Sequence, residues 1–404
     1  MSKYNFIDLF SGCGGLLDGF MQTGHYNPIA SVEWEQKPAE TLAKRLHDKW
    51  KIKDSDESVI RFDVQRVDEL FNGFDDPKYG KNKGLTKLIN GKTIDFIIGG
   101  PPCQAYSVAG RVRDKKSMKE DYRNYLFEYY LEIVSRLQPK LFVFENVPGM
   151  LSAMPDGTPI INLIKRDIES KGYEIIDDIK KYAVLDASDF NVPQARKRVI
   201  LIGMNKQYFK NKNIQEELKK FYTEILPKYK GKKKISVKEA IGDLPKCIPT
   251  YKDNRPSHVV ESNNISWHKP RYHGLRDVKI FKMLAEDLES GENKYVDSNI
   301  LKDIYNEATG SNTNVHKYHV LRKDEPSTTI LAHLHKDGLR FIHYDSSQAR
   351  SITVREAARL QSFDDDFDFV GSQGDAYKMI GNAVPVKFAK AIASAIFEFM
   401  KEEW

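Results

Sequence analysis

The sequence has only three cysteines, Cys13, Cys103 and Cys247, among 404 residues. They are too few and too scattered for a disulfide framework or a zinc site. No run approaches the roughly 20 apolar residues of a membrane-spanning helix, and the amino terminus lacks the apolar core of a signal peptide. No internal repeat or low-complexity segment is visible. We therefore expect a cytoplasmic protein without a membrane anchor, in which a thiol stays free to react.

What remains is the composition of an ordinary globular protein, with 40% hydrophobic and 30% charged residues. Up to about residue 204, short apolar segments alternate with helical patterns, which predicts an α/β fold with a doubly wound, mostly parallel sheet. The clearest expected strands are 6–10, 28–32, 94–98, 141–145 and 199–203. The clearest expected helices are 39–50, 125–137, 160–171 and 389–400.

Positive charge is concentrated in one region. Residues 205–340 contain 26 Lys and Arg against 18 Asp and Glu, an excess of eight, whereas the whole chain carries a net charge of +6. A lysine run alone is more often a solvated surface, but such asymmetry favours a module that faces nucleic acid.

A glycine-rich turn, Ser11-Gly12-Cys13-Gly14-Gly15-Leu16, follows the first expected strand. Such a turn lets the backbone approach a ligand closely. It differs from the dinucleotide pattern, because no glycine stands at the third glycine position of G-x-G-x-x-G and the charged Asp18 follows directly. The carboxylate of Asp8 would repel a pyrophosphate but could hold a cationic ligand, which favours a positively charged nucleoside over NAD.

The next two strand ends carry groups that suit adenosine. Glu33 is placed to accept hydrogen bonds from ribose hydroxyls, Trp34 could stack on a purine, and Asp63 could accept from the adenine amine. A solvated strand end and a core aromatic are the alternative readings of Glu33 and Trp34. Together with the glycine turn, these residues favour S-adenosylmethionine.

Cys103 follows Gly99-Gly100-Pro101-Pro102, so it lies on a stiff loop after a buried strand. A lone cysteine is usually a small buried hydrophobe, but this position suits a nucleophile. Glu145 ends another apolar strand and is expected at the same edge of the sheet. Arg196 and Arg198 precede a further strand and can point to one side, where they suit a phosphate or a base carbonyl. An edge carboxylate and a surface arginine pair are equally common explanations.

These motifs occur in an order that resembles the DNA (cytosine-5) methyltransferases over nearly the whole chain. The resemblance is carried by Phe6–Gly15, Val32–Trp34, Gly99–Gly110 (GGPPCQAYSVAG), Glu145–Gly149 (ENVPG), Gln194–Arg198 (QARKR), Arg355–Phe363 (REAARLQSF) and Gly381–Pro385 (GNAVP). Tyr106, where the family often has Phe, is a conservative departure.

The resemblance implies a mechanism. Cys103 would add to C6 of a flipped-out cytosine, Glu145 would hold N4 and N3, and Arg198 would bind O2. Arg196 would support the active-site loop or bind a phosphate. C5 would then take the methyl group of S-adenosylmethionine, leaving S-adenosylhomocysteine, and no metal is expected.

The glycine turn, the strand ends and the resemblance also predict the binding residues. The expected cofactor residues are Asp8, Phe10, Gly12, Gly14, Gly15, Leu16, Glu33, Trp34, Asp63, Val64, Pro102, Asn382 and Val384. The expected DNA contacts are Gln104, Ser107, Arg111, Arg113, Lys269, Arg271 and Arg276, with His268, His273 and residues 331–340 as further candidates. We expect a discontinuous catalytic domain, 1–204 with 375–404, and a target-recognition domain, 205–374.

The expected partner is duplex DNA, with a cognate restriction endonuclease as a possible companion and a monomer as the working form. Two alternatives stay open: a tRNA cytosine-5 methyltransferase, and a catalytically silent DNA-binding relative. A nicotinamide oxidoreductase is disfavoured by Asp8 and Asp18.

Overall fold

The chain forms two compact units in a computed structural model. The first comprises 1–190, 196–232 and 384–404, and the second comprises 191–195 and 233–383. The structure describes residues 3–102, 125–154, 157–253, 255–262, 264–315, 317–336 and 338–402.

An eight-stranded sheet forms the centre of the first unit, with strand order β3-β2-β1-β6-β7-β10-β8 and β9 paired to β10. Strands β1, β2, β3, β6 and β7 are parallel, and β10 runs antiparallel to β7. The prediction of a mostly parallel α/β sheet is confirmed, and each of the five expected strands falls on one of these. The bounds are β1 Tyr4–Leu9, β2 Tyr26–Glu33, β3 Val59–Arg61, β6 Phe96–Gly99, β7 Leu141–Asn146, β8 Tyr173–Glu174, β9 Val184–Asp186 and β10 Lys197–Asn205.

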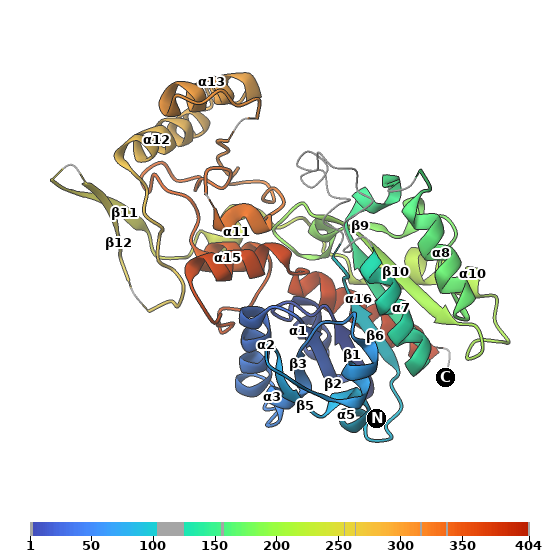
Figure 1. Cartoon of the computed structure of the whole chain (residues 1–404). Coiled ribbons are helices and arrows are strands. Elements are labelled where there is room, and N and C mark those ends of the chain that lie inside the picture. The colour runs from blue at the N-terminus through green and yellow to red at the C-terminus, as the bar shows by residue number, and fades with distance from the viewer. Residues whose placement is uncertain are drawn as a thin grey trace. The chain divides into compact units, whose positions relative to one another are not determined.

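Helices cover both faces of this sheet (Figure 1). Phe6 of β1 packs on Phe20 of α1, whereas Tyr130 of α7 packs on Phe142 of β7 from the opposite face. Alternation along the strands produces this division, because successive side chains point to opposite faces. The helices of the first unit are α1 Gly15–Met21, α2 Gln36–Asp48, α3 Ser55–Ser58, α4 Val67–Asn72, α5 Gly84–Ile89, α7 Leu126–Leu137, α8 Ile160–Ser170, α9 Ile179–Tyr182, α10 Ile214–Lys220 and α16 Val386–Glu402. A small hairpin, β4 Phe74–Asp76 with β5 Gly80–Asn82, follows α4.

The last helix, α16, packs on α1 at the other end of the sequence. Gly19 makes this approach close, since a Cβ there would lie 2.4 Å from the Cβ of Ala389 and 2.6 Å from the carbonyl oxygen of Val386. The Tyr26 hydroxyl donates to the carbonyl of Ala393 at 2.6 Å. The first unit is therefore discontinuous in sequence, and its last part begins at 384, whereas the bound expected from the sequence is 375.

The lysine-rich segment 206–232 belongs to the first unit, where Lys220 pairs with Glu402 of α16 at 3.1 Å. Residues 205–232 hold eight lysines and three acidic residues, whereas the second unit holds 22 Lys and Arg and 22 Asp and Glu. The second unit is thus neutral overall. The charge argument for a basic inserted module was wrong, because most of the excess belongs to a segment that packs on the sheet unit.

The second unit combines a hairpin with helices. Its elements are α11 Val237–Ile241, β11 Cys247–Lys252, β12 Arg255–Val260, α12 Leu275–Ser290, α13 Ser298–Thr309, α14 Val354–Leu360 and α15 Gln373–Asn382. Phe281, Leu284 and Tyr318 form one apolar cluster. The guanidinium of Arg350, fully buried, donates to both oxygens of Glu356 at 2.6 Å. Among the described residues, none of the helices combines the length and apolar character needed to cross a membrane.

Candidate active site

The central ion pair of the candidate site joins β7 and β10. The Nε of Arg198 lies 2.8 Å from Oε1 of Glu145, and the two side chains are 11% and 14% exposed. They meet because Ile200, two residues after Arg198, is opposite Glu145 in the antiparallel register, which puts both side chains on one face. Arg198 also donates from Nη1 to the carbonyl of Lys197 at 2.7 Å. Burial lowers the pKa of Arg198, although the charge of Glu145 opposes this.

The chain that leads to Cys103 passes beside Glu145. The side-chain amide of Asn146, the residue after Glu145, donates from Nδ2 to the carbonyl of Pro101 at 3.2 Å. A Cβ on Gly100 would lie 2.6 Å from Oε2 of Glu145, so a larger residue there would displace that carboxyl group. Cys103, with Gln104, Ser107, Arg111 and Arg113, lies outside the described residues. The described chain therefore reaches Pro102, one residue before Cys103, directly after two residues that lie against the Glu145 region.

Arg196 lies deep in the first unit and is only 2% exposed. Burial, reinforced by the nearby charge of Arg198, lowers its pKa well below the ordinary value. Its backbone carbonyl accepts from the amide of Ala187 at 3.0 Å. Of the two roles expected for Arg196, support of the site fits this burial better than a phosphate contact at the surface.

The other two cysteines are placed as core residues. Cys13 and Cys247 are both buried, and burial raises their pKa values to about 12 and about 11. A thiol attacks as its thiolate, so neither is suited to nucleophilic chemistry.

Glu33 ties the glycine-rich turn to the end of β2. Its Oε2 accepts from the amide of Gly12 and its Oε1 from the amide of Glu35, both at 2.8 Å. Burial raises its pKa to about 6 despite these hydrogen bonds. The turn itself needs left-handed backbone, with φ of 55° at Gly12 and 90° at Gly14. Sequence reasoning assigned Glu33 to a ribose and missed this second role, which no local pattern signals.

Asp8 is a buried carboxyl with no hydrogen-bond partner among the described residues, and it is 1% exposed. The hydroxyl of Ser31, its register neighbour on β2, is likewise without a partner there. Burial raises the pKa of Asp8 well above its ordinary value. Buried polar atoms of this kind are normally satisfied, so the end of β1 has unused capacity for a ligand with donors or positive charge. This fits the cationic nucleoside that the sequence favours.

Trp34 and Asp63 lie at the ends of β2 and β3. Trp34 is 47% exposed, and the ammonium of Lys78, from the β4–β5 hairpin, lies 5.6 Å from its ring centroid. A carboxylate oxygen of Asp63 accepts from the amide of Gln65 at 3.0 Å. The pKa of Lys78 is raised chiefly by its contact with Tyr79, and the charge of Asp63 adds to this. Sequence reasoning missed Lys78, because the hairpin that carries it has no motif.

The remaining cofactor candidates divide between the units. Leu16 is buried in α1, Val64 is buried after β3, and Val384, 9% exposed, lies two residues before the start of α16 in the first unit. Phe10 has a φ of 58° and opens the glycine turn, with Gly15 at the start of α1. Asn382 ends α15 in the second unit, so its part in a cofactor site stays a prediction.

Asp18, which directly follows the position of the missing third glycine, has structural partners. Its Oδ1 accepts from Nε of Arg45 and from the indole of Trp50, both at 2.8 Å. This buried pair joins α1 to α2.

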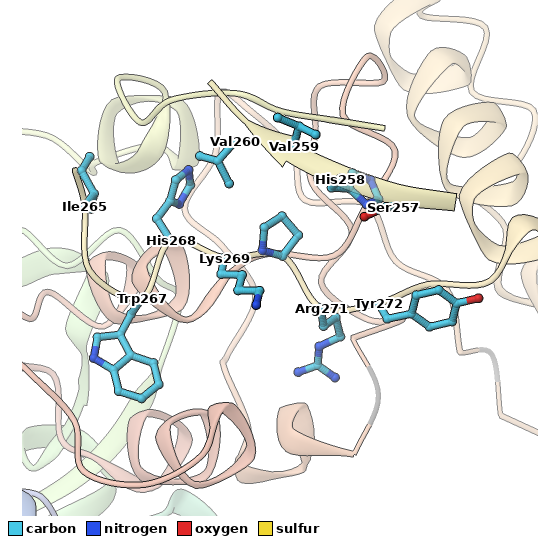
Figure 2. Close-up of a pocket in the computed structure, with 11 residues that line it drawn as sticks. Ser257, His258, Val259, Val260, Ile265, Trp267, His268, Lys269, Arg271 and Tyr272 are labelled. Carbon is cyan, nitrogen blue, oxygen red and sulfur yellow. The ribbon is translucent and has the colours of Figure 1, made fainter. Parts of the chain in front are cut away.

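The expected DNA contacts of the second unit differ in exposure. Lys269 is exposed beside a groove, and Figure 2 shows its side chain with that of Arg271. Arg276 pairs with Asp277 at 2.9 Å and donates to the carbonyl of Ala308 at 3.2 Å, which joins α12 to α13.

His268 and His273 are buried and hydrogen-bonded inside the second unit. The first contacts Thr353 at 3.0 Å and the second contacts Ser351 at 2.9 Å. They are fold residues, and the expectation that they contact DNA is corrected. Their sequence signal, two histidines in a basic stretch, does not report burial.

The sheet order and the antiparallel strand β10 next to β7 together define an S-adenosylmethionine-dependent methyltransferase fold. Two solved structures share it. One is described as a DNA modification methyltransferase of an E. coli prophage, with a TM-score of 0.60, 24% identity, and coverage of 99% of this chain and 100% of that chain. The other is the S. pombe Dnmt2 methyltransferase, with a TM-score of 0.54, 13% identity, and coverage of 100% and 99%.

The model of the C-5 cytosine-specific DNA methylase family matches residues 4–398, and the chain belongs to that family. Type II methyltransferase M.Bpa9945I of Bacillus paralicheniformis is 32% identical over 96% of this chain and 98% of its own. Type II methyltransferase M1.HphI of Haemophilus parahaemolyticus is 31% identical over 100% and 91%. M.NgoPII of Neisseria gonorrhoeae, also a type II methyltransferase, is 31% identical over 96% and 94%.

Proposed function

We propose that this member of the family methylates C5 of cytosine within a specific sequence of duplex DNA, with Cys103 as the nucleophile. The observation that carries the proposal is the Glu145–Arg198 pair, at 2.8 Å, beside the loop that leads to Cys103. A carboxyl and a guanidinium held together on one face can bind the amidine edge and the carbonyl of one pyrimidine.

The chemistry assigns a task to each residue. Cytosine C5 is too electron-poor to attack a methyl donor, so the thiolate of Cys103 adds to C6 and makes C5 nucleophilic. Glu145 holds N4 and donates a proton toward N3 while negative charge develops there. Arg198 stabilises that charge at O2. After methyl transfer, loss of the C5 proton expels Cys103 and restores the aromatic ring.

S-adenosylmethionine is the proposed donor, and it supplies a methyl group on a sulfonium sulfur. In this proposal Asp8 and the Gly12–Gly15 turn take the cationic methionine part, Glu33 accepts from the ribose, and Trp34 with Asp63 binds adenine. The orphaned carboxyl of Asp8 and the exposed ring of Trp34 support this assignment. We further propose Val64, Pro102, Asn382 and Val384 as lining residues.

The target atoms are hidden in stacked DNA, so the base must leave the helix, at a cost of a few kcal/mol. We propose that Gln104, Ser107, Arg111 and Arg113 contact DNA during this step, with Lys269 and Arg271 of the second unit. Residues 233–374 are the proposed target-recognition domain; the stretch 205–232, which the sequence-based bounds of 205–374 included, belongs to the first unit. The names of the relatives support a restriction-modification setting, with a cognate endonuclease, in a bacterial cytoplasm; we propose a monomer as the acting form.

Bisulfite sequencing of DNA from cells that express the wild type or Cys103→Ser tests the proposal. We expect one methylated sequence motif with the wild type and none with the variant. Methylation that persists in Cys103→Ser would refute the nucleophile. Transfer of label from S-adenosylmethionine to tRNA, but not to duplex DNA, would show that tRNA is the substrate instead of duplex DNA.

A further inference from the structure

The β11–β12 hairpin presents one anchored face and one open face. Its register pairs Cys247 with Val260, Pro249 with His258, and Thr250 with Ser257. Because side chains alternate along a strand, the set with Cys247, Pro249 and His258 lies on one face. This face is anchored, since the amide of Cys247 donates to Oε1 of Gln348 and the His258 ring contacts the carbonyl of Gln348, both at 2.9 Å.

The opposite side, here called the open face, consists of three cross-strand pairs: Ile248 with Val259, Thr250 with Ser257, and Lys252 with Arg255. All but Ile248 are exposed, and Val259 is 57% exposed, which is unusual for a valine in a strand. Along the ribbon, the apolar pair Ile248–Val259 is followed by the hydroxyl pair Thr250–Ser257 and then by the cationic pair Lys252–Arg255. Within the described part of the chain, neither Lys252 nor Arg255 has an ion pair.

A groove of about 690 Å³ borders β12, and the segment 265–272 forms its other wall. Figure 2 shows Trp267, Lys269 and Arg271 extending from that segment on the side away from β12. The Arg271 guanidinium is held 4.4 Å from the ring centroid of Tyr377 and donates to the carbonyl of Leu334 at 2.8 Å. Tyr272 is 73% exposed. Lys269 and Arg271 thus extend from this wall on the side away from β12, in a unit whose net charge, with these cations counted, is zero.

We propose that the open face of the β11–β12 ribbon enters the major groove of the target DNA and determines which sequence is methylated. The inference rests on the proposed function and adds its specificity-determining residues. A two-stranded ribbon fits the major groove, where hydroxyls read base edges and apolar groups contact the thymine methyl. Thr250, Ser257 and Val259 are the readers, whereas Lys252 and Arg255 bind phosphates and set the register. The open face has no acidic residue, which suits DNA.

The reading role is tested by the set of methylated sites. Thr250→Ala with Ser257→Ala, and separately Val259→Ser, are expressed in a host without endogenous cytosine methylation, and the genome is bisulfite sequenced. We expect a broadened or altered motif, while the dissociation constant for S-adenosylmethionine changes less than twofold. An unchanged motif in both variants overturns the proposal.

The phosphate role is tested by purified Lys252→Ala/Arg255→Ala on naked duplex DNA. We expect at least tenfold weaker binding, and a slope of log affinity against log salt that falls by about 2, since each lost phosphate contact removes about 0.9. The matched control is Lys279→Ala/Lys282→Ala on α12, which should leave both unchanged. Equal affinity and slope in the ribbon variant overturn the proposal.

Two outcomes separate this proposal from the proposed function. If the wild type itself neither methylates DNA nor binds S-adenosylmethionine, the proposed function fails. If Lys252→Ala/Arg255→Ala loses methylation in cells but binds and methylates naked duplex normally, the ribbon serves a protein partner. In that case the inference about the ribbon fails, and the proposed function stands. Cofactor binding by the first unit and a thermal melt show whether a variant is folded, so that a misfolded ribbon is not read as a lost contact.

Discussion

Oε1 of Glu145 and Nε of Arg198 lie 2.8 Å apart on neighbouring antiparallel strands of the first unit. The pair brings a carboxyl and a cation together beside Pro101 and Gly100, directly before Cys103 in the sequence. Each side chain is mostly buried, so each charge depends on the other for its solvation.

Neutralising either member of this pair should reduce methyl transfer far more than it reduces DNA binding. We expect Glu145→Gln and Arg198→Met each to lower the rate by about 10²–10⁴-fold, the usual range for a lost proton donor or charge stabiliser. Single-turnover transfer of labelled methyl groups measures this. The neighbouring Lys197→Met, exposed in the same strand, is the control and should keep the wild-type rate. A variant of the pair with half the normal rate would contradict the assignment.

Only one of the three cysteines should matter for activity. We expect Cys103→Ser to abolish methylation, and Cys13→Ala and Cys247→Ala to retain it with a modest loss of stability, because their buried thiols, with pKa values of about 12 and 11, are not thiolates at neutral pH. Brief alkylation of the native enzyme followed by peptide mass spectrometry should modify neither Cys13 nor Cys247. Rapid labelling of either would show that its thiol is accessible to solvent, contrary to the prediction.

Cofactor binding should depend on pH through Glu33. Its pKa is raised from 4.5 to about 6, so its neutral form favours folding below 4.5, and this contribution is lost as the pH rises through 6. Ribose hydroxyls donate to the carboxylate, so S-adenosylmethionine should bind more tightly as the pH rises from 5 to 7. Calorimetry should show this change of affinity in the wild type. In Glu33→Gln the affinity for S-adenosylmethionine should be weaker and should not vary with pH over this range. An identical pH profile in the variant would remove Glu33 from the site.

The contact between α1 and α16 should be sensitive to a single methyl group. Gly19→Ala places its Cβ 2.4 Å from that of Ala389 and 2.6 Å from a backbone oxygen, and overpacking of this kind costs about 1–3 kcal/mol. Gly274→Ala, where nothing lies within 4 Å of the new Cβ, is the control. Urea unfolding of the full chain measures both. Equal urea midpoints for Gly19→Ala and Gly274→Ala would contradict the prediction, because they would mean that α1 and α16 accommodate the added methyl group without loss of stability.

Much of the sheet could be predicted because its signals are local. The runs at 141–145 and 199–203 are apolar, short and bounded by turn residues, and they fall within β7 and β10. The helix expected over 389–400 falls within α16. The motifs around Cys103, Glu145 and Arg198 also indicated the family. Each motif is a run of neighbouring residues next to a strand, so it can be recognised from the sequence.

The tertiary structure decided what depends on pairing and burial. The amino-acid order determined the strands, the glycine turn and the family, because these follow from neighbouring residues. It did not determine that 206–232 packs on the sheet unit, that His268 and His273 are buried, that Glu33 braces Gly12, or which face of β11–β12 stays open. Those properties arise when residues distant in sequence exclude water from one another, and no local pattern carries that information.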